Sequence, residues 1–202
     1  MQLAQPIIRS IREQIADTLR AEVLAGTWDN DTPVREQSLA DRFGVSRGPI
    51  RDVLMQLSQE GVLVYQQNKG VKVSCPPKEA ERQLLQSIRL QTEVHCLEQG
   101  MNRFTIEDDA QLDLILEDLA RACDTRDWGL IADRDLALHR YIIRRASQEL
   151  ETVWQSITSR LFMDYSRIQD LSEVVAEHEA IVNAIHDRDL AKAEVALNGN
   201  II

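Results

Sequence analysis

Residues 33–64 read PVREQSLADRFGVSRGPIRDVLMQLSQEGVLV, and this stretch decides the fold of the first part of the chain. The pattern predicts two short helices that meet at a sharp turn. Gly44 suits the left-handed position that ends the first helix, and Ser46 is a typical N-cap for the second. Pro49 falls in the first turn of that second helix, where a missing N–H group does no harm. Apolar residues then recur with helical spacing and predict one buried face, made of Ile50, Val53, Leu54 and Leu57.

Arg47 and Arg51 lie four residues apart on a neighbouring face of the second helix. Two helices arranged in this way place the second one in the major groove of DNA. Ala40 is small at the point where the two helices must cross closely. An ordinary helical hairpin with two solvated arginines is the alternative, but the spacing of the turn residues favours DNA binding.

The segment after the second helix predicts a β-hairpin. Val62–Val64 and Val71–Val73 are short β-type runs, and Asn68, Lys69 and Gly70 between them suit a tight turn. A helix-turn-helix followed by a hairpin is a winged helix. Lys69 at the tip is then placed to enter the minor groove or to contact phosphate.

The charge balance divides the chain at Cys75-Pro76-Pro77. Residues 1–75 carry nine basic and nine acidic side chains, so the net charge of −10 comes entirely from residues 76–202. An acidic region is repelled by phosphate and should lie away from a duplex. We therefore expect a DNA-binding domain over residues 1–75 and a second domain over residues 76–202.

The composition also favours a cytoplasmic protein without membrane contact. There is no apolar run near the ~20 residues that span a bilayer, and no basic-then-apolar secretory signal. The chain has three cysteines, Cys75, Cys96 and Cys123. Their odd number, and the absence of the close spacing that metal-binding cysteines show, favour free thiols in a reducing compartment.

Residues 78–202 show helical periodicity with hardly a strand signal. Thr105 with Asp108 resembles a capping box, and Asp127 and Ser172 are good N-caps. We expect helices near 79–101, 106–123, 127–146, 148–169, 172–187 and 189–199. The predicted fold class is mainly α: a winged helix-turn-helix domain followed by an all-helical bundle, which can enclose a pocket.

Three polar side chains fall on helix faces that should be buried. Asp135 and His139 lie within the apolar stripe of one helix, and His178 lies within that of a later helix. An unpaired buried charge is costly, so these groups need partners. One carboxylate and two imidazoles can supply three ligands to a divalent metal. The alternative is separately satisfied polar residues, for example Asp135 paired with an arginine.

The segment from Ile7 to Val73 resembles the winged-helix domain of GntR-type bacterial transcription regulators. In that family an N-terminal helix, here expected from Ile8 to Leu24, precedes the motif L-A-x-x-x-G-V-S-R-x-P-[VI]-R-[ED], which this chain matches from Leu39 to Asp52. Family members often carry an arginine where this chain has Gln37, so either Arg35 replaces that phosphate contact or the contact is lost. The resemblance implies DNA contacts by Arg35, Gln37, Ser46, Arg47, Gly48, Arg51, Lys69 and Gly70.

The second part resembles the all-helical effector domain of the FadR branch of these regulators, the type called FCD. Its signature is Asp-x3-His, then Glu-His on a later helix, then a final His. Asp135 with His139 and Glu177 with His178 match, whereas the final position falls on Asn200, a poor ligand for metals that prefer imidazole. The resemblance implies a divalent ion (Zn²⁺, Ni²⁺ or Mn²⁺) in a site that is three-coordinate, weak or empty. The implied ligands are Asp135, His139, His178 and Asn200.

Arg89 matches the arginine that faces the pocket in FCD domains, where a guanidinium binds a carboxylate effector. A surface salt bridge with Glu93 is the alternative. His95, on the same helix, either lines the pocket or is a core histidine. His186 is expected to be a solvated residue at a helix end.

These features predict a transcription regulator, expected to be a repressor, controlled by a small carboxylate effector. We expect it to bind a pseudo-palindromic operator as a homodimer paired through residues 78–202. One alternative is a metal-dependent enzyme built on Asp135, His139 and His178, although no nucleophile or further acid–base pair accompanies them. Another is an architectural DNA-binding protein without an effector, in which the three polar residues would be accidental.

Overall fold

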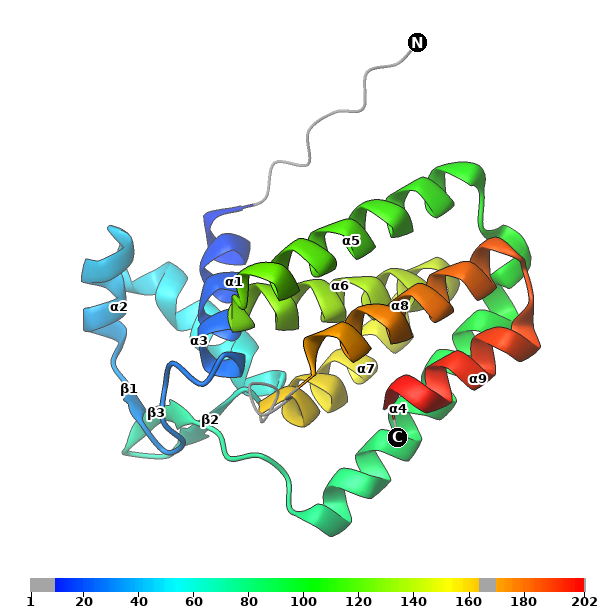
Figure 1. Ribbon diagram of the computed structural model, residues 1–202. Coiled ribbons are helices and arrows are strands. Elements are labelled where there is room, and N and C mark those ends of the chain that lie inside the picture. The colour runs from blue at the N-terminus through cyan, green and yellow to red at the C-terminus, as the bar shows by residue number, and fades with distance from the viewer. Residues whose placement is uncertain (1–9, 164–169, 202) are drawn as a thin grey trace.

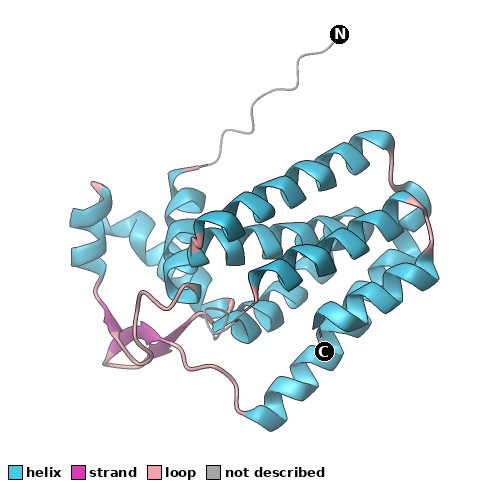
Figure 2. Cartoon of the chain, viewed as in Figure 1, coloured by secondary structure: helices cyan, strands magenta, loops and turns pink. Residues whose placement is uncertain are grey.

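The computed structural model describes residues 10–163 and 170–201, which form a small head and a larger helical body (Figure 1). The head contains α1 (Ile11–Leu24), β1 (Pro33–Val34), α2 (Glu36–Phe43), α3 (Arg47–Gln59), β2 (Leu63–Gln66) and β3 (Gly70–Val73). The body contains α4 (Glu79–Gly100), a 3-10 turn (Met101–Arg103), α5 (Ile106–Thr125), α6 (Trp128–Ala146), α7 (Gln148–Leu161), α8 (Leu171–His186) and α9 (Leu190–Ile201). Helices dominate, and the strands are confined to one corner of the head (Figure 2). The predicted mainly α fold class is confirmed.

The helix-turn-helix forms as its sequence predicts, except at one cap. Gly44 ends α2 in the left-handed conformation with φ of 65°. Ser46 occupies the N-cap position of α3, but its side chain makes no capping hydrogen bond, so the prediction that it caps this helix is wrong in that respect. Its extended backbone turns the chain into α3 without help from the hydroxyl group. The hydroxyl therefore stays at the exposed start of the helix.

The wing contains one strand more than expected. β3 lies between β1 and β2 and pairs antiparallel with both. The two-residue β1 is too short for a sequence pattern to reveal. Asn68 and Gly70 both have positive φ, 65° and 89°, as the predicted tight turn requires.

Two predicted helix caps of the body are confirmed and one is wrong. Thr105 and Asp108 form the expected capping box, and Asp127 caps α6 as expected. In contrast, α8 is capped by Asp170, which accepts hydrogen bonds from the backbone of Ser172 and Glu173, so Ser172 is not the cap.

At the N-terminus, Ser10 is an extended N-cap that forms a capping box with Glu13. This box makes α1 begin at Ile11 rather than at Ile8. α7 ends at Leu161, before the predicted end at 169, and the part of that prediction over 164–169 lies outside the described residues.

The body is a bundle in which α5, α6 and α8 run side by side (Figure 1). α4 packs against α6, α7 and α9 and closes another side. The side chains between these helices form an apolar core that includes Leu97, Leu112, Leu138, Ile142, Ile181, Ile185 and Leu197. None of the helices within the described ranges is long and apolar enough to cross a membrane.

Head and body share a second apolar core. Ile15 and Leu19 of α1 belong to the same buried cluster as Ile131 of α6 and Phe162 at the end of α7. At Gly129, a Cβ atom would lie 3.5 Å from the carbonyl oxygen of Ala21, so α1 approaches α6 closely. The two expected domains are therefore docked on one another through a continuous hydrophobic surface.

Candidate metal centre and DNA-binding face

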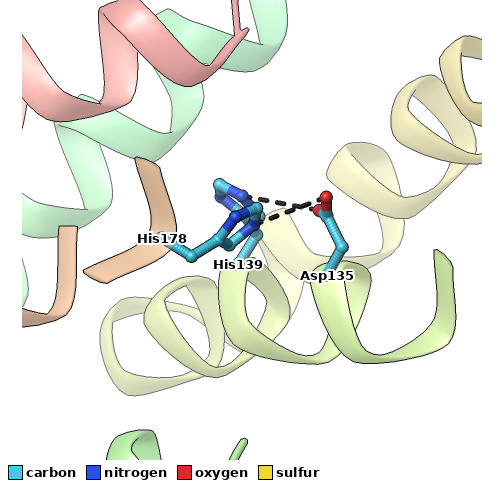
Figure 3. A group of neighbouring side chains, drawn as sticks. All are labelled: Asp135, His139 and His178. Carbon is cyan, nitrogen blue, oxygen red and sulfur yellow. Dashed lines mark ion pairs between the residues drawn. The ribbon is translucent and has the colours of Figure 1, made fainter. Parts of the chain in front are cut away.

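Asp135, His139 and His178 converge inside the bundle. Asp135 and His139 are one turn apart on α6, His178 comes from α8, and all three are buried. Figure 3 shows both imidazole rings turned toward the Asp135 carboxylate. The distances are 3.6 Å from His139 Nε2 to Oδ1 and 3.4 Å from His178 Nε2 to Oδ2. One ligand atom from each residue lies within 4.8 Å of the others, so the three can surround one cation.

Hydrogen bonds at the far side of each ring determine its tautomer. His139 Nδ1 lies 2.6 Å from Glu93 Oε2, and His178 Nδ1 lies 2.7 Å from the carbonyl oxygen of Val174. A carbonyl or carboxylate oxygen only accepts, so each Nδ1 donates, and each neutral ring then has a lone pair on Nε2. Both Nε2 atoms are buried and make no hydrogen bond to the described residues. These are the atoms that a metal would bind.

Glu93 of α4 is the supporting residue that sequence reasoning missed. Besides His139, it accepts hydrogen bonds from Arg89 Nε at 2.9 Å and Trp154 Nε1 at 2.7 Å. Burial by itself would raise the pKa of Glu93, but the charges of His139 and Arg89 outweigh burial and lower the pKa to about 2. The available signal was its position four residues after Arg89. The Arg89–Glu93 salt bridge exists, but it is buried, not on the surface.

The protonation of the three converging groups follows from the same balance. Burial would raise the pKa of Asp135, but the neighbouring His178, His139 and Arg89 hold it well below its usual range. Burial lowers the pKa of His139 despite Glu93. For His178, burial is outweighed by Asp135 and the Val174 carbonyl, and the pKa is raised. The carboxylate is therefore ionised, and the His139 ring is neutral at pH 7.

A cavity of about 190 Å³ opens beside this centre. At ~30 Å³ per water, it holds roughly six waters, which suits a small ligand. Arg89 faces it with its guanidinium 5.2 Å from the Phe162 ring centre, and Arg89 Nη2 is buried with no hydrogen bond to the described residues. The cavity is lined by Arg82, Gln86, Arg89, Asp135, Leu161, Phe162, Val174, Glu177, His178, Asn200 and Ile201.

The other predicted pocket residues behave differently. Asn200 lines the cavity, and its Nδ2 donates to Glu177 Oε2 at 3.0 Å. His95 is exposed beside Glu98, so both interpretations of this residue, as pocket lining and as core, are wrong. The face of α4 that packs inward carries Arg89, Glu93 and Cys96, and the helical period turns His95 away from it. His186 ends α8 half-buried, 3.4 Å from Asp113.

The predicted DNA-contacting residues all lie on exposed parts of the head. Arg47 and Arg51 project from α3 with side chains 58% and 60% exposed, and both hydrogen bond to Glu36 of α2. Gln37 donates to Asp41 along α2. The remaining predicted contacts, which are exposed at the α2 and α3 starts and at the wing tip, are Arg35, Ser46, Gly48, Lys69 and Gly70.

Two family models match this chain and together cover both parts. Residues 11–73 match the family described as bacterial regulatory proteins, gntR family, and residues 85–201 match the FCD domain. The protein belongs to the GntR family of regulators with an FCD domain. It is thus a DNA-binding transcription regulator with an effector-binding domain.

Relatives and solved structures agree with this assignment. The gluconate operon transcriptional repressor of Bacillus licheniformis is 25% identical over 193 residues, which cover 88% of this chain and 77% of the relative. The HTH-type transcriptional repressor RspR of Escherichia coli is 20% identical, covering 95% of this chain and 86% of the relative. The structure of E. coli McbR/YncC has the same fold, with a TM-score of 0.79 at 19% identity, covering 96% of this chain and 94% of that one. These relatives are regulators, and the metal-dependent enzyme alternative finds no support among them.

Proposed function

We propose that this GntR-family regulator is a repressor whose DNA binding is controlled by a small carboxylate at a divalent metal ion. The supporting observation is that the buried Nε2 atoms of His139 and His178 converge on the buried Asp135 carboxylate, so that three possible ligand atoms lie within 4.8 Å of one another. Buried lone pairs without partners are unfavourable unless a cation or water satisfies them. The residues fit a cation such as Zn²⁺, Ni²⁺ or Mn²⁺, which would supply an open coordination position facing the cavity.

Arg89 suits the role of binding the acid. Its Nη2 is buried without a hydrogen-bond partner at the cavity wall, while Nε is held by Glu93. A guanidinium fixed at one edge presents the remaining donors to a carboxylate in a set orientation. Asn200 is a weaker candidate as a ligand because it would offer only a neutral amide oxygen; its amide nitrogen donates to Glu177.

The head would bind DNA through α3 and the wing. Arg47 and Arg51 would read base edges, and Ser46 with the backbone N–H of Gly48 would bind phosphate at the start of α3. Arg35 and Gln37 at the start of α2, and Lys69 and Gly70 at the wing tip, would contact the flanking backbone. Two such heads in a homodimer would match a pseudo-palindromic operator in the cytoplasm.

A melting experiment tests the metal centre. Adding Zn²⁺, Ni²⁺ or Mn²⁺ to metal-stripped protein should raise the melting temperature, because the ion binds only the folded state. At an ion concentration ~100 times the dissociation constant, the rise should be about 5–10 °C. Alanine at Asp135, His139 or His178 should abolish the rise, whereas His95→Ala, which removes an exposed imidazole, should retain it. A wild-type melting temperature that ignores all three ions would overturn the proposal.

A further inference from the structure

Glu36 pairs with both exposed arginines of α3, Arg47 and Arg51. Its Oε2 accepts a hydrogen bond from Arg47 Nη2 at 2.9 Å, and its two oxygens accept from Arg51 Nε and Nη2 at 3.3 and 3.4 Å. Glu36 is the first residue of α2, where the positive end of the helix favours a carboxylate. One anion at the junction of α2 and α3 therefore organises two exposed cations.

The contacts leave the arginines able to read DNA while they stay paired. Arg51 uses its Nε–Nη2 edge on Glu36, so the opposite edge of the guanidinium points away from that carboxylate. Arg47 uses Nη2 alone. A guanidinium has five N–H donors, and two of them suffice for a bidentate contact to guanine. Holding these long side chains in one orientation reduces the conformational entropy that binding would otherwise remove.

The charge of Glu36 also acts on DNA that has the wrong sequence. Non-specific binding comes from neutralised phosphates and depends on the net positive charge of the contacting face. A carboxylate between the two arginines lowers that charge and repels phosphate. In the correct sequence, the base pairs accept directed hydrogen bonds from the two arginines, which offsets this repulsion. DNA of random sequence offers the arginines only its phosphate backbone.

We propose that Glu36 is a positioning residue that sets the sequence specificity of this regulator. It orients Arg47 and Arg51 toward base edges and penalises their use on the phosphate backbone. This inference rests on the proposed role of these two arginines as DNA contacts.

The test measures how tightly the full-length chain binds each of two DNA duplexes. One is recovered by selection from a random duplex pool with the wild-type protein, and the other is a scrambled duplex of the same composition. Fluorescence anisotropy at several salt concentrations gives both affinities and the salt dependence. The variants are Glu36→Gln, Glu36→Asp, Arg47→Ala and Arg51→Ala. The matched control is Glu22→Gln, which removes the same charge from another Arg–Glu pair of the head, the one with Arg42.

Glu36→Gln should bind the scrambled duplex about threefold more tightly, with a steeper salt dependence, and the selected duplex about threefold to tenfold more weakly. Glu36→Asp keeps the negative charge, but its shorter side chain does not reach the two arginines. This variant should therefore lose affinity for the selected duplex without gaining any for the scrambled one. Glu22→Gln should leave the ratio of the two affinities unchanged.

The inference fails if Glu36→Gln keeps the wild-type ratio of affinities, whether both rise together or neither changes. The arginine variants separate this failure from a wrong choice of DNA-contacting residues. Suppose that Arg47→Ala and Arg51→Ala lose affinity for the selected duplex, whereas Glu36→Gln keeps the wild-type ratio of the two affinities. Then only the proposed role of Glu36 is wrong. If the arginine variants bind like wild type, the assignment of α3 to the groove is wrong as well.

Discussion

Glu93 links the two proposed functions of the pocket, metal binding and acid binding, through one carboxylate. One oxygen accepts from His139 and thereby turns its Nε2, the proposed metal ligand, toward Asp135, while the other accepts from Arg89 and Trp154. A group that accepts a hydrogen bond from the far nitrogen of a metal-binding histidine orients the ring and raises the basicity of the ligand nitrogen. A change at Glu93 should therefore alter the metal site directly, whereas a change at Arg89 should alter the anion site.

We expect Glu93→Gln to weaken Zn²⁺ binding about 10–100-fold, because His139 loses the anion that fixes its tautomer. Arg89→Gln should leave Zn²⁺ affinity nearly intact and remove the binding of a carboxylate probe such as citrate to the Zn²⁺-loaded protein. Isothermal titration calorimetry measures both. The reverse pattern, with metal lost in the Arg89 variant and retained in the Glu93 variant, would contradict these roles.

At the scale of elements, the start of α5 connects neighbouring helices at the end of the bundle that lies away from the head (Figure 1). Asp108 accepts hydrogen bonds from Thr105 at the cap and from the hydroxyl group of Tyr141 on α6, and pairs with Arg145. Its neighbour Asp109 pairs with Arg188 in the turn between α8 and α9. Two adjacent carboxylates thus connect α5 to α6 and to the α8–α9 turn.

This arrangement predicts an acid-sensitive stability. Burial would raise the pKa of Asp108, but its bonds to Tyr141 and Thr105 and the charge of Arg145 lower it from the usual 3.8. A lowered pKa means that the ionised form stabilises the fold above pH 4 or so, and that this contribution is lost as the pH falls through the folded-state value. Asp108→Asn should cost about 1–3 kcal/mol of unfolding free energy at pH 7.

The cost of Asp108→Asn should begin to shrink as the pH falls below about 4, because the carboxylate of the unfolded wild-type chain is then protonated, and it should be lost once the pH falls through the lowered folded-state pKa. Urea unfolding at a series of pH values measures it. Glu117→Gln, at an exposed position of the same helix, is the control and should have little effect at any pH. A cost at Asp108 that stays constant from pH 7 to pH 3 would show that its charge is not what matters.

At the scale of the whole molecule, some residues that line the cavity also pack in the apolar core beneath the DNA-binding head. Leu161, Phe162 and Val174 line the cavity and also belong to the apolar core that includes Ile15 and Leu19 of α1. A ligand that moves Arg89 from its position over the Phe162 ring would change the packing beneath the head. Close-packed interiors transmit such shifts because they have no empty space to absorb them.

The proposed homodimer also belongs to this scale. Leu84 and Ile88 lie one turn apart on α4 with side chains exposed, Leu84 by 61%. We expect a homodimer in light scattering at micromolar concentration, with twice the mass of the 23.0 kDa chain. Leu84→Glu should weaken it, whereas Val195→Glu, a similar change at an exposed position of α9, should not. A wild-type monomer that still binds a palindromic duplex tightly would rule out the dimer.

The sequence by itself determined the features that depend on the local backbone and on periodicity. Gly44 marks the turn because a left-handed residue is needed there, and the spacing of Arg47 and Arg51 places them on one face of α3. Asp135 and His139 were recognisable as inward-facing because they interrupt an apolar stripe of a helix. These signals are contained within one element, so no tertiary contact is needed to interpret them.

Only the tertiary structure decided which side chains from different elements meet. α4 has a weak apolar stripe, so its rotation, which buries Glu93 and exposes His95, follows from packing against α6 and α7. The pairing of Glu36 with the arginines of α3 likewise depends on the angle between two helices. Contacts across such distances are set by the combined packing of many residues, because each single contact is too weak to dictate the arrangement.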